Sequence, residues 1–401
     1  MFGEPTQDAR LERLLARHRD AVVAEPVRGR PTLVRRDEIL VAGPDMPAVE
    51  DRVRRWLDSR EDGPDACRVR LRAPARVDVC ELSARLNEDS AHRTLAVAPN
   101  HLVHGQPMWW TGPAGRPRPA APPPAPTAGT AATGRPVTVA VLDTGLSPHP
   151  WYDSTDWYAA QRDEVAEVLD ADLDYTLDAQ AGHGTFIAGV LLRHAPGVRI
   201  RAERVIGGDG VGDEFGVLRA LASLTSLTSL APWGRADVVN LSLGCHTYDD
   251  RPSPVVARAV AALGRRTVVV ACAGNQASDR PFWPAALKRV IAVAALDGAD
   301  RAAFSNYGWW VDACAPGAGV TSCFVRFDGP RPPVRGIDPD AFHGYAAWSG
   351  TSFAAPAVAG AIARLAAAED LPAPVAAGRL LDPARHRTLP DLGVVLATLR
   401  N

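Results

Sequence analysis

The feature that most constrains the fold is an alternation of short apolar runs with helical patterns in the middle of the chain. The runs have the length of buried strands and lie at 137–142, 198–205, 238–243, 267–271 and 290–294. Between them, apolar residues recur at helical spacing in 217–224 and 255–263. Strands joined by helical crossovers form parallel sheets that are covered on both faces. The sequence therefore predicts an α/β fold with a mostly parallel sheet.

Polar residues follow two of these runs directly. Asp143 comes after the run at 137–142, and Asn275 ends an Ala-Gly-Asn turn after the run at 267–271. In parallel α/β sheets, ligands bind beyond the carboxyl ends of the strands. We therefore expect the chemistry of this chain to lie along one edge of the sheet.

A stretch rich in small residues lies near the C-terminus, with the sequence Gly-Thr-Ser-Phe-Ala-Ala-Pro at 350–356. Small side chains let a backbone turn approach its neighbours closely. Pro356 favours the first turn of a helix, where the missing amide hydrogen costs least. We therefore expect Ser352 at the N-terminus of a buried helix, with its hydroxyl facing a cleft.

Three motifs combine into one chemistry. Asp143 opens an Asp-Thr-Gly sequence, His183 opens a His-Gly-Thr sequence, and Ser352 follows far along the chain. A serine hydroxyl needs a base to take its proton as it attacks, an imidazole suits that role, and a carboxylate fixes the imidazole tautomer. The order Asp, His, Ser is that of subtilisin, and residues 137–365 resemble a subtilisin-like serine protease (subtilase, peptidase family S8).

The resemblance implies a subtilisin-like three-layer fold and a serine endopeptidase that hydrolyses peptide bonds through an acyl-enzyme. It also implies that Asn275 is the oxyanion-hole donor, together with the backbone amide of Ser352. The pocket walls and the strand that pairs with substrate are assigned, by the same resemblance, to Ser242, Leu243, Gly244, Ala273 and Gly274. No metal ligand is assigned. Many relatives contain structural calcium, which stays open here because no diagnostic loop is visible.

Three alternatives compete with this interpretation. The related sedolisin-type peptidases have Glu in place of the histidine base and Asp in place of the oxyanion Asn, so His183 and Asn275 argue against them. A cysteine nucleophile at Cys245 or Cys272 lacks a comparable sequence setting. A catalytically silent binding protein of the same fold is the alternative from a different class, and the intact set of motifs counts against it.

The chain divides into four parts by its patterning. Residues 1–30 are charged and irregular, apart from a short helix expected from Arg10 to Arg19. Residues 31–105 form a small α+β domain whose size and position resemble the propeptide of subtilases, with a permanent accessory domain as the alternative. Residues 106–134 are a linker rich in Pro, Ala and Gly, and 135–401 form the peptidase domain. We expect 102–105 to occupy the cleft like substrate, which makes the chain a zymogen inhibited by its own N-terminal domain.

Composition limits the partners and the compartment. The formal net charge of -2 gives no indication of a nucleic-acid or membrane partner, so the expected partner is a protein or peptide substrate. Residues 1–22 lack the apolar core of a secretory leader, which predicts a cytoplasmic protein and leaves export by another route open. The six cysteines show no metal-binding spacing and are expected to be free thiols.

Overall fold

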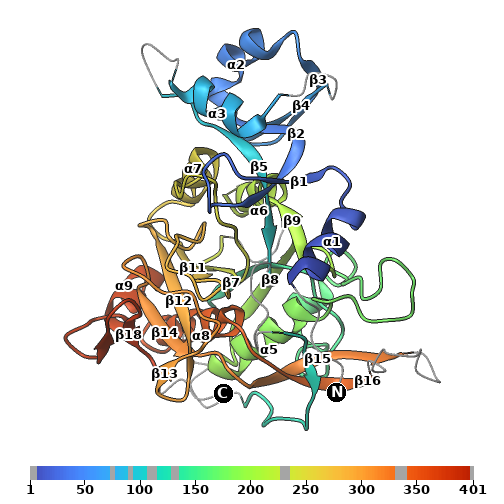
Figure 1. Ribbon diagram of the computed structural model, residues 1–401. Helices are drawn as coiled ribbons and strands as arrows, with labels where there is room; N and C mark the ends of the chain where they lie inside the picture. The colour runs from blue at the N-terminus through green and yellow to red at the C-terminus, as the bar shows by residue number, and fades with distance from the viewer. Residues whose placement is uncertain are drawn as a thin grey trace.

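The structure is a computed structural model. It describes residues 7–72, 77–88, 94–105, 115–127, 135–225, 235–329 and 341–397, without the side chains of 7–9. A small N-terminal domain lies at one end of a larger domain, and a single strand, β5 (Val97–His104), reaches from the first into the second (Figure 1).

The larger domain is built around one sheet of nine strands in the described part of the chain, ordered β17-β18-β14-β12-β11-β10-β7-β8 with β13 beside β12. All neighbours from β18 to β8 are parallel, and only β13 and β17 pair antiparallel. The strands are β7 (Thr138–Asp143), β8 (Arg199–Arg204), β10 (Val238–Leu241), β11 (Val268–Cys272), β12 (Val290–Asp297), β13 (Asp300–Arg301), β14 (Ala313–Pro316), β17 (Thr388–Leu389) and β18 (Gly393–Val395).

Helices cover both faces of this sheet. Figure 1 shows α6 and α7 above the sheet and α5 and α8 below it, which gives three layers. The helices of this domain are α4 (Asp156–Ala159), α5 (His183–His194), α6 (Glu214–Thr225), α7 (Pro254–Ala262), α8 (Thr351–Ala368) and α9 (Ala373–Leu380). The expected α/β class with a mostly parallel sheet is confirmed, and each of the five expected strands is present.

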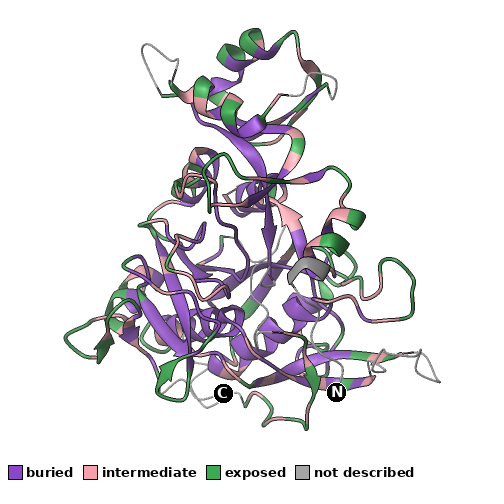
Figure 2. Cartoon of the chain, in the orientation of Figure 1, coloured by how far each residue is buried: buried purple, intermediate pink, exposed green. Residues whose placement is uncertain are grey.

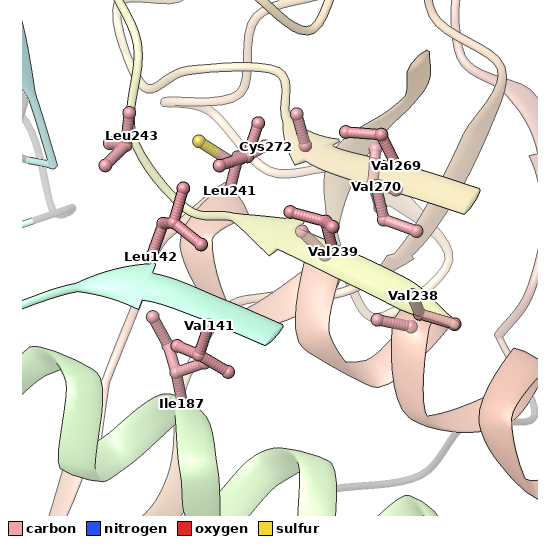
Figure 3. Packing of buried hydrophobic residues seen from close by; sticks show 14 of the residues in the cluster. Val141, Leu142, Ile187, Val238, Val239, Leu241, Leu243, Val269, Val270 and Cys272 are labelled. Atoms are coloured by element: carbon pink, nitrogen blue, oxygen red, sulfur yellow. The ribbon is translucent and has the colours of Figure 1, made fainter. Parts of the chain in front are cut away.

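Burial explains why the strands read as continuous apolar runs. Every residue of β7, β10 and β11 is buried, because helices cover the sheet on both sides (Figure 2). Figure 3 shows Leu142 of β7 beside Leu241 of β10, and Ile187 of α5 next to Val141. The central strands are therefore fixed firmly enough to present the residues at their ends in defined positions.

The N-terminal domain is a small α+β unit with a core of its own, which confirms the expected class. Its sheet has the antiparallel order β3-β4-β2-β5, and β1 pairs with β2. Val69, Val49 and Cys80 belong to its separate apolar cluster. Its other elements are α1 (Gln7–Arg17), β1 (Ala21–Ala24), β2 (Thr32–Ala42), η1 (Gly43–Asp45), α2 (Met46–Val53), β3 (Leu57–Asp62), β4 (Ala66–Leu71) and α3 (Val79–Glu88).

Strand β5 joins the two domains. It continues past the N-terminal sheet and pairs antiparallel with β9 (Val211–Asp213) of the larger domain, with Val103 opposite Gly212. Leu14 of α1, Leu102 of β5 and Val211 of β9 pack in one small apolar cluster at this junction. The N-terminal segment therefore contributes to the contact between the domains.

Two expectations about the connecting parts are wrong in detail. Residues 1–30 contain the expected short helix as α1, but they also contain β1, which was not expected and which extends the N-terminal sheet. The Pro-rich linker contains a short strand, β6 (Arg118–Pro119), which pairs with β16 (Ala341–Trp348) beside β15 (Val320–Asp328). Both segments found partners far away in the sequence, which local composition cannot reveal.

Candidate active site

Asp143 and His183 meet at the edge of the sheet. Asp143 is the last residue of β7 and His183 is the first residue of α5. The imidazole Nδ1 lies 2.7 Å from Asp143 Oδ1, and both side chains are 1% exposed. Asp143 Oδ1 also accepts the backbone N–H of Thr144 at 2.8 Å. The carboxylate thus engages Nδ1 of the imidazole, and Nε2 remains for a reacting group.

Gly182 allows the chain to enter α5 in this position. Its φ of 83° lies in the left-handed region that glycine adopts without strain. A Cβ at Gly182 would come within 2.3 Å of the Phe324 ring. The glycine before the histidine is therefore required by both the backbone conformation and the lack of space.

Aromatic rings surround the imidazole. The ring of His183 lies edge-on to Trp348 with 5.3 Å between centroids, and 5.5 Å from the ring of Phe353. These rings limit the directions in which the imidazole can turn and exclude water from its sides. Phe353 directly follows Ser352 in the chain, so the start of α8 contributes both the serine hydroxyl and an aromatic side chain that lines the pocket.

Ser352 is the second residue of α8 and shares a pocket with His183 and Asn275. Its hydroxyl donates to the carbonyl of Ser242 at 3.4 Å, not to the imidazole. In enzymes without substrate, catalytic hydrogen bonds are often long and tighten only in the complex. The pocket is lined by Gly105, Gly115, Gln180, His183, Asn275, Trp348, Ser349, Gly350, Ser352 and Phe353.

Pro356 lies deeper in the helix than its sequence pattern predicted. It is inside α8, five residues after Thr351, so it removes the N–H that would bond to the Ser352 carbonyl. The hydroxyl of Ser242 donates to that carbonyl instead, at 2.9 Å, and itself accepts from Asn240 Nδ2 at 3.0 Å. The proline is tolerated because the end of β10 supplies the missing donor.

Asn275 is oriented by the start of α8. Its Oδ1 accepts the backbone N–H and the hydroxyl of Thr351, at 2.8 and 2.9 Å. The Thr351 hydroxyl in turn accepts the N–H of Gly274 at 3.1 Å. Because the side-chain oxygen is engaged, the amide group that remains for a ligand in the pocket is Nδ2.

The five residues expected to bind substrate have different surroundings in the structure. Gly244 exchanges two backbone hydrogen bonds with His104, at 3.0 and 3.2 Å. Leu243 and Ala273 are fully buried in the main core, and their predicted role in binding substrate stays a prediction. Ser242 and Gly274 support the start of α8 through the bonds described above.

The chain's own residues 102–105 occupy this part of the cleft. Gly105 donates to the carbonyl of Gly210 at 3.1 Å, after the pairing of His104 with Gly244. A Cβ on Gly105 would lie 3.6 Å from His183 Cε1. The segment therefore reaches the imidazole as an extended strand held from both sides.

Several lining residues were missed by the sequence reasoning. Trp348 and Ser349 lie just before the Gly-Thr-Ser motif, and Gln180 lies three residues before His183. Proximity to a recognised motif was a usable signal for all three. Gly115 carried none, because it lies in the linker, where the indole N–H of Trp348 donates to its carbonyl at 2.7 Å.

The two cysteines near the pocket are unsuited to act as nucleophiles. Burial raises the pKa of Cys272 to about 12 and raises the pKa of Cys245 as well. The thiolate is the nucleophilic form, so both groups stay inert at neutral pH. All six cysteines of the chain are buried and unpaired.

Within the described residues, one group of carboxylates could suit the structural calcium that the sequence left open. Ligand oxygens of Asp170, Asp172 and Asp174 lie within 4.8 Å of one another on the surface. Carboxylate oxygens are the ligands that calcium prefers. The group lies outside the lining of the pocket that contains Ser352.

The chain is similar to known proteins of one family. A model described as the subtilase family matches residues 134–384. A thermophilic serine proteinase from Bacillus sp. (strain AK1) is 36% identical over 241 residues, covering 57% of this chain and 51% of that protein. Subtilisin BL from Lederbergia lenta is 34% identical over 242 residues, covering 58% of this chain and 76% of that protein. A solved protease structure from Pseudoalteromonas arctica PAMC 21717 has a TM-score of 0.51 and 25% identity, covering 67% of this chain and 91% of that one.

This chain spans about half the length of the first of these relatives. The relatives also correct the expected cytoplasmic location. They include the minor extracellular protease Epr of Bacillus subtilis (strain 168), 31% identical over 250 residues, covering 58% of this chain and 32% of that protein. The expectation rested only on the lack of an apolar leader, which says little about where a chain acts. Among the described helices, α8 is long and apolar enough to cross a membrane, yet 78% of it is buried inside the protein, as in a core helix.

Proposed function

The chain belongs to the subtilase family, and on this premise we propose that it is a serine endopeptidase acting through Asp143, His183 and Ser352. The observation that carries the proposal is the 2.7 Å contact between Asp143 Oδ1 and Nδ1 of His183, which lines the same pocket as Ser352. Asn275, fixed by Thr351, offers its Nδ2 to the same pocket.

The proposed reaction has two halves. The substrate lies extended along Gly244, and Ser352 Oγ attacks its carbonyl carbon while His183 Nε2 takes the hydroxyl proton. Asn275 Nδ2 and the Ser352 N–H stabilise the oxyanion. The imidazolium, held by Asp143, gives its proton to the leaving amine, and an acyl-enzyme remains. Water then attacks the ester by the same route and releases the acid and free Ser352.

The proposal includes regulation by the N-terminal domain. Its support is that β5 ends in the cleft, paired with Gly244 on one side and with β9 on the other. Gly105 and Gly115 both line the pocket that contains Ser352, so the chain comes to the site from both directions. We expect self-cleavage between these two glycines.

Polar contacts hold the N-terminal domain against the larger domain. Arg258 of α7 contacts Asp45 at 2.7 Å, and Arg35 contacts Asp213 at 3.1 Å. The buried pair His101 and Glu214 lies 3.2 Å apart where β5 meets α6. Such contacts would keep the domain bound after a cut, so that inhibition outlasts the cleavage.

Measuring the intact mass of the chain over time tests both the proposed proteolytic activity and the proposed self-cleavage of the chain. The full-length chain and its Ser352→Ala variant are incubated in parallel, and the wild type alone is expected to lose a fragment ending between Gly105 and Gly115. A fragment from both samples would mean a contaminating protease. If both stay intact and a fluorophosphonate labels neither, the chain is a silent binding protein and the proposal is wrong.

A pair of substitutions tests the inhibition separately. His104→Pro removes the N–H that donates to Gly244, whereas His104→Ala keeps it. We expect faster fluorophosphonate labelling of Ser352 in the proline variant and little change in the alanine variant. Equal rates in both would contradict an inhibitory role for this strand.

A further inference from the structure

Glu167 lies between the two segments that carry Asp143 and His183. Its neighbour Ala166 forms a parallel bridge with Leu146, three residues after Asp143. The N–H of Leu146 donates to the carbonyl of Val165 at 2.8 Å, and Arg204 donates to the carbonyl of Ala166 at 2.8 Å. The backbone around Glu167 is thus attached to the loop that follows β7, although Glu167 was not singled out by any motif.

The carboxylate of Glu167 accepts four hydrogen bonds. Oε1 accepts from the hydroxyl of Thr144 and from the N–H of Gly182, the latter at 2.8 Å. Oε2 accepts from the hydroxyls of Ser147 and Thr185, at 3.1 and 2.9 Å. The residue as a whole is partly exposed, but all four donors belong to buried residues. Two donors come from the segment after Asp143 and two from the residues flanking His183.

Two of the hydroxyls also connect the segments directly. Thr144 Oγ1 accepts the N–H of Gly184 at 2.9 Å, and Thr185 Oγ1 accepts the N–H of Ser147 at 2.8 Å. A carboxylate can only accept, so it forces both hydroxyls to donate to it. The oxygen lone pairs of the two hydroxyls then accept the backbone N–H groups of the opposite segment. The ionised carboxylate of Glu167 therefore sets the direction in which these two hydroxyls donate.

The network carries an electrostatic cost. Burial raises the pKa of Glu167 to about 7, against the opposing effect of its hydrogen bonds with Thr144, Thr185 and Gly182. A buried carboxylate is retained at such a cost only where several donors compensate it. Packing alone would be served as well by an apolar side chain.

We propose that Glu167 is a positioning residue, whose carboxylate fixes the Asp143–His183 pair by tying the loop after β7 to the start of α5. This inference rests on the proposed proteolytic function. Glu167 touches neither the pocket nor the reacting atoms, so it acts through the orientation of the imidazole. Displacements of about 1 Å at a reacting group cost up to about a hundredfold in rate.

The test uses the full-length chain and a fluorophosphonate probe, whose labelling separates binding (KI) from the chemical step (kinact). Glu167→Gln keeps the volume but replaces one acceptor by a donor. Glu164→Gln is the matched control, because Glu164 is an exposed acid on the same segment. We expect kinact to fall at least about tenfold in Glu167→Gln, with KI unchanged within about twofold. Glu164→Gln should label like the wild type.

Two milder variants guard against loss of the fold. Ser147→Ala removes one of the four bonds, and Glu167→Asp keeps the charge on a shorter arm. Both should show intermediate kinact values with unchanged melting temperatures. A kinact equal to that of the wild type in Glu167→Gln, or a change confined to KI, would overturn the proposal.

A second readout does not depend on activity. The imidazole proton shared by His183 and Asp143 gives a low-field proton NMR signal when the bond is ordered. It should persist in Glu164→Gln and be lost or broadened in folded Glu167→Gln. If no sample labels at all, the proposed function fails while this signal still decides the role of Glu167. A signal retained in Glu167→Gln would refute that role.

Discussion

Replacing Ser242 by Ala should loosen the start of α8, because Ser242 supplies a hydrogen bond that the helix itself cannot make. Pro356 removes the N–H that would pair with the Ser352 carbonyl, and the Ser242 hydroxyl donates to that carbonyl at 2.9 Å. Leaving a buried carbonyl without a donor costs about 1–3 kcal/mol. Since α8 carries Ser352, we expect this loss at the site itself.

Hydrogen exchange of the α8 amides measures the effect, in a Ser352→Ala background that prevents self-cleavage. Ser242→Ala should speed their exchange by about 5- to 150-fold, the range that corresponds to this cost. Pro356→Ala restores the helical N–H and should recover part of the loss, with a coupling of about 1 kcal/mol in the double-mutant cycle. Strictly additive effects of the two substitutions would show that they do not share the carbonyl and would refute the reasoning.

Three further predictions concern single residues. Asn275→Ala should lower the rate of peptide hydrolysis about 10²- to 10³-fold, and an unchanged rate would exclude Asn275 as an oxyanion donor. Gly184→Ala would place a Cβ 2.2 Å from the Gly145 carbonyl and should cost about 1–3 kcal/mol in denaturant unfolding, whereas Gly197→Ala, in open space, should cost little. Burial lowers the pKa of His149 in the folded protein to about 4. Between pH 6.5 and 4 this histidine is therefore protonated in the unfolded chain but not in the folded one, and the free energy of unfolding should fall as the pH drops through this range. The loss of stability at low pH should be smaller in His149→Gln, as measured by denaturant unfolding at each pH. The same pH profile in the variant and the wild type would contradict this role of His149.

The parts of this fold that sequence could predict are those fixed by local patterns. The strands at β7, β10, β11 and β12 are continuous apolar runs because helices cover both of their faces, so composition alone reveals them. Asp143, His183 and Ser352 could be proposed from the sequence because each stands in a short motif, and the fold brings Asp143 into contact with His183, which lines one pocket with Ser352. Parallel topology accounts for that convergence.

The features that sequence could not predict depend on partners far along the chain. Glu167 lies in a run of charged residues with no periodicity, and its four donors come from two other segments. Pro356 was expected in the first helical turn, because sequence does not reveal the compensating hydroxyl of Ser242, which follows β10 and lies 110 residues before the Ser352 carbonyl that it binds. Strand β6 forms in a Pro-rich stretch only because the edge of β16 accepts it. In each case the deciding interaction is tertiary.

Ser352 is, in this interpretation, an activated nucleophile in the pocket that it shares with His183 and Asn275. The most direct test is to label the full-length chain with a fluorophosphonate and to map the modified residue by mass spectrometry. We predict a single modification at Ser352, which is absent in Ser352→Ala and strongly slowed in His183→Ala. Modification at another residue, or equal labelling with and without His183, would contradict it.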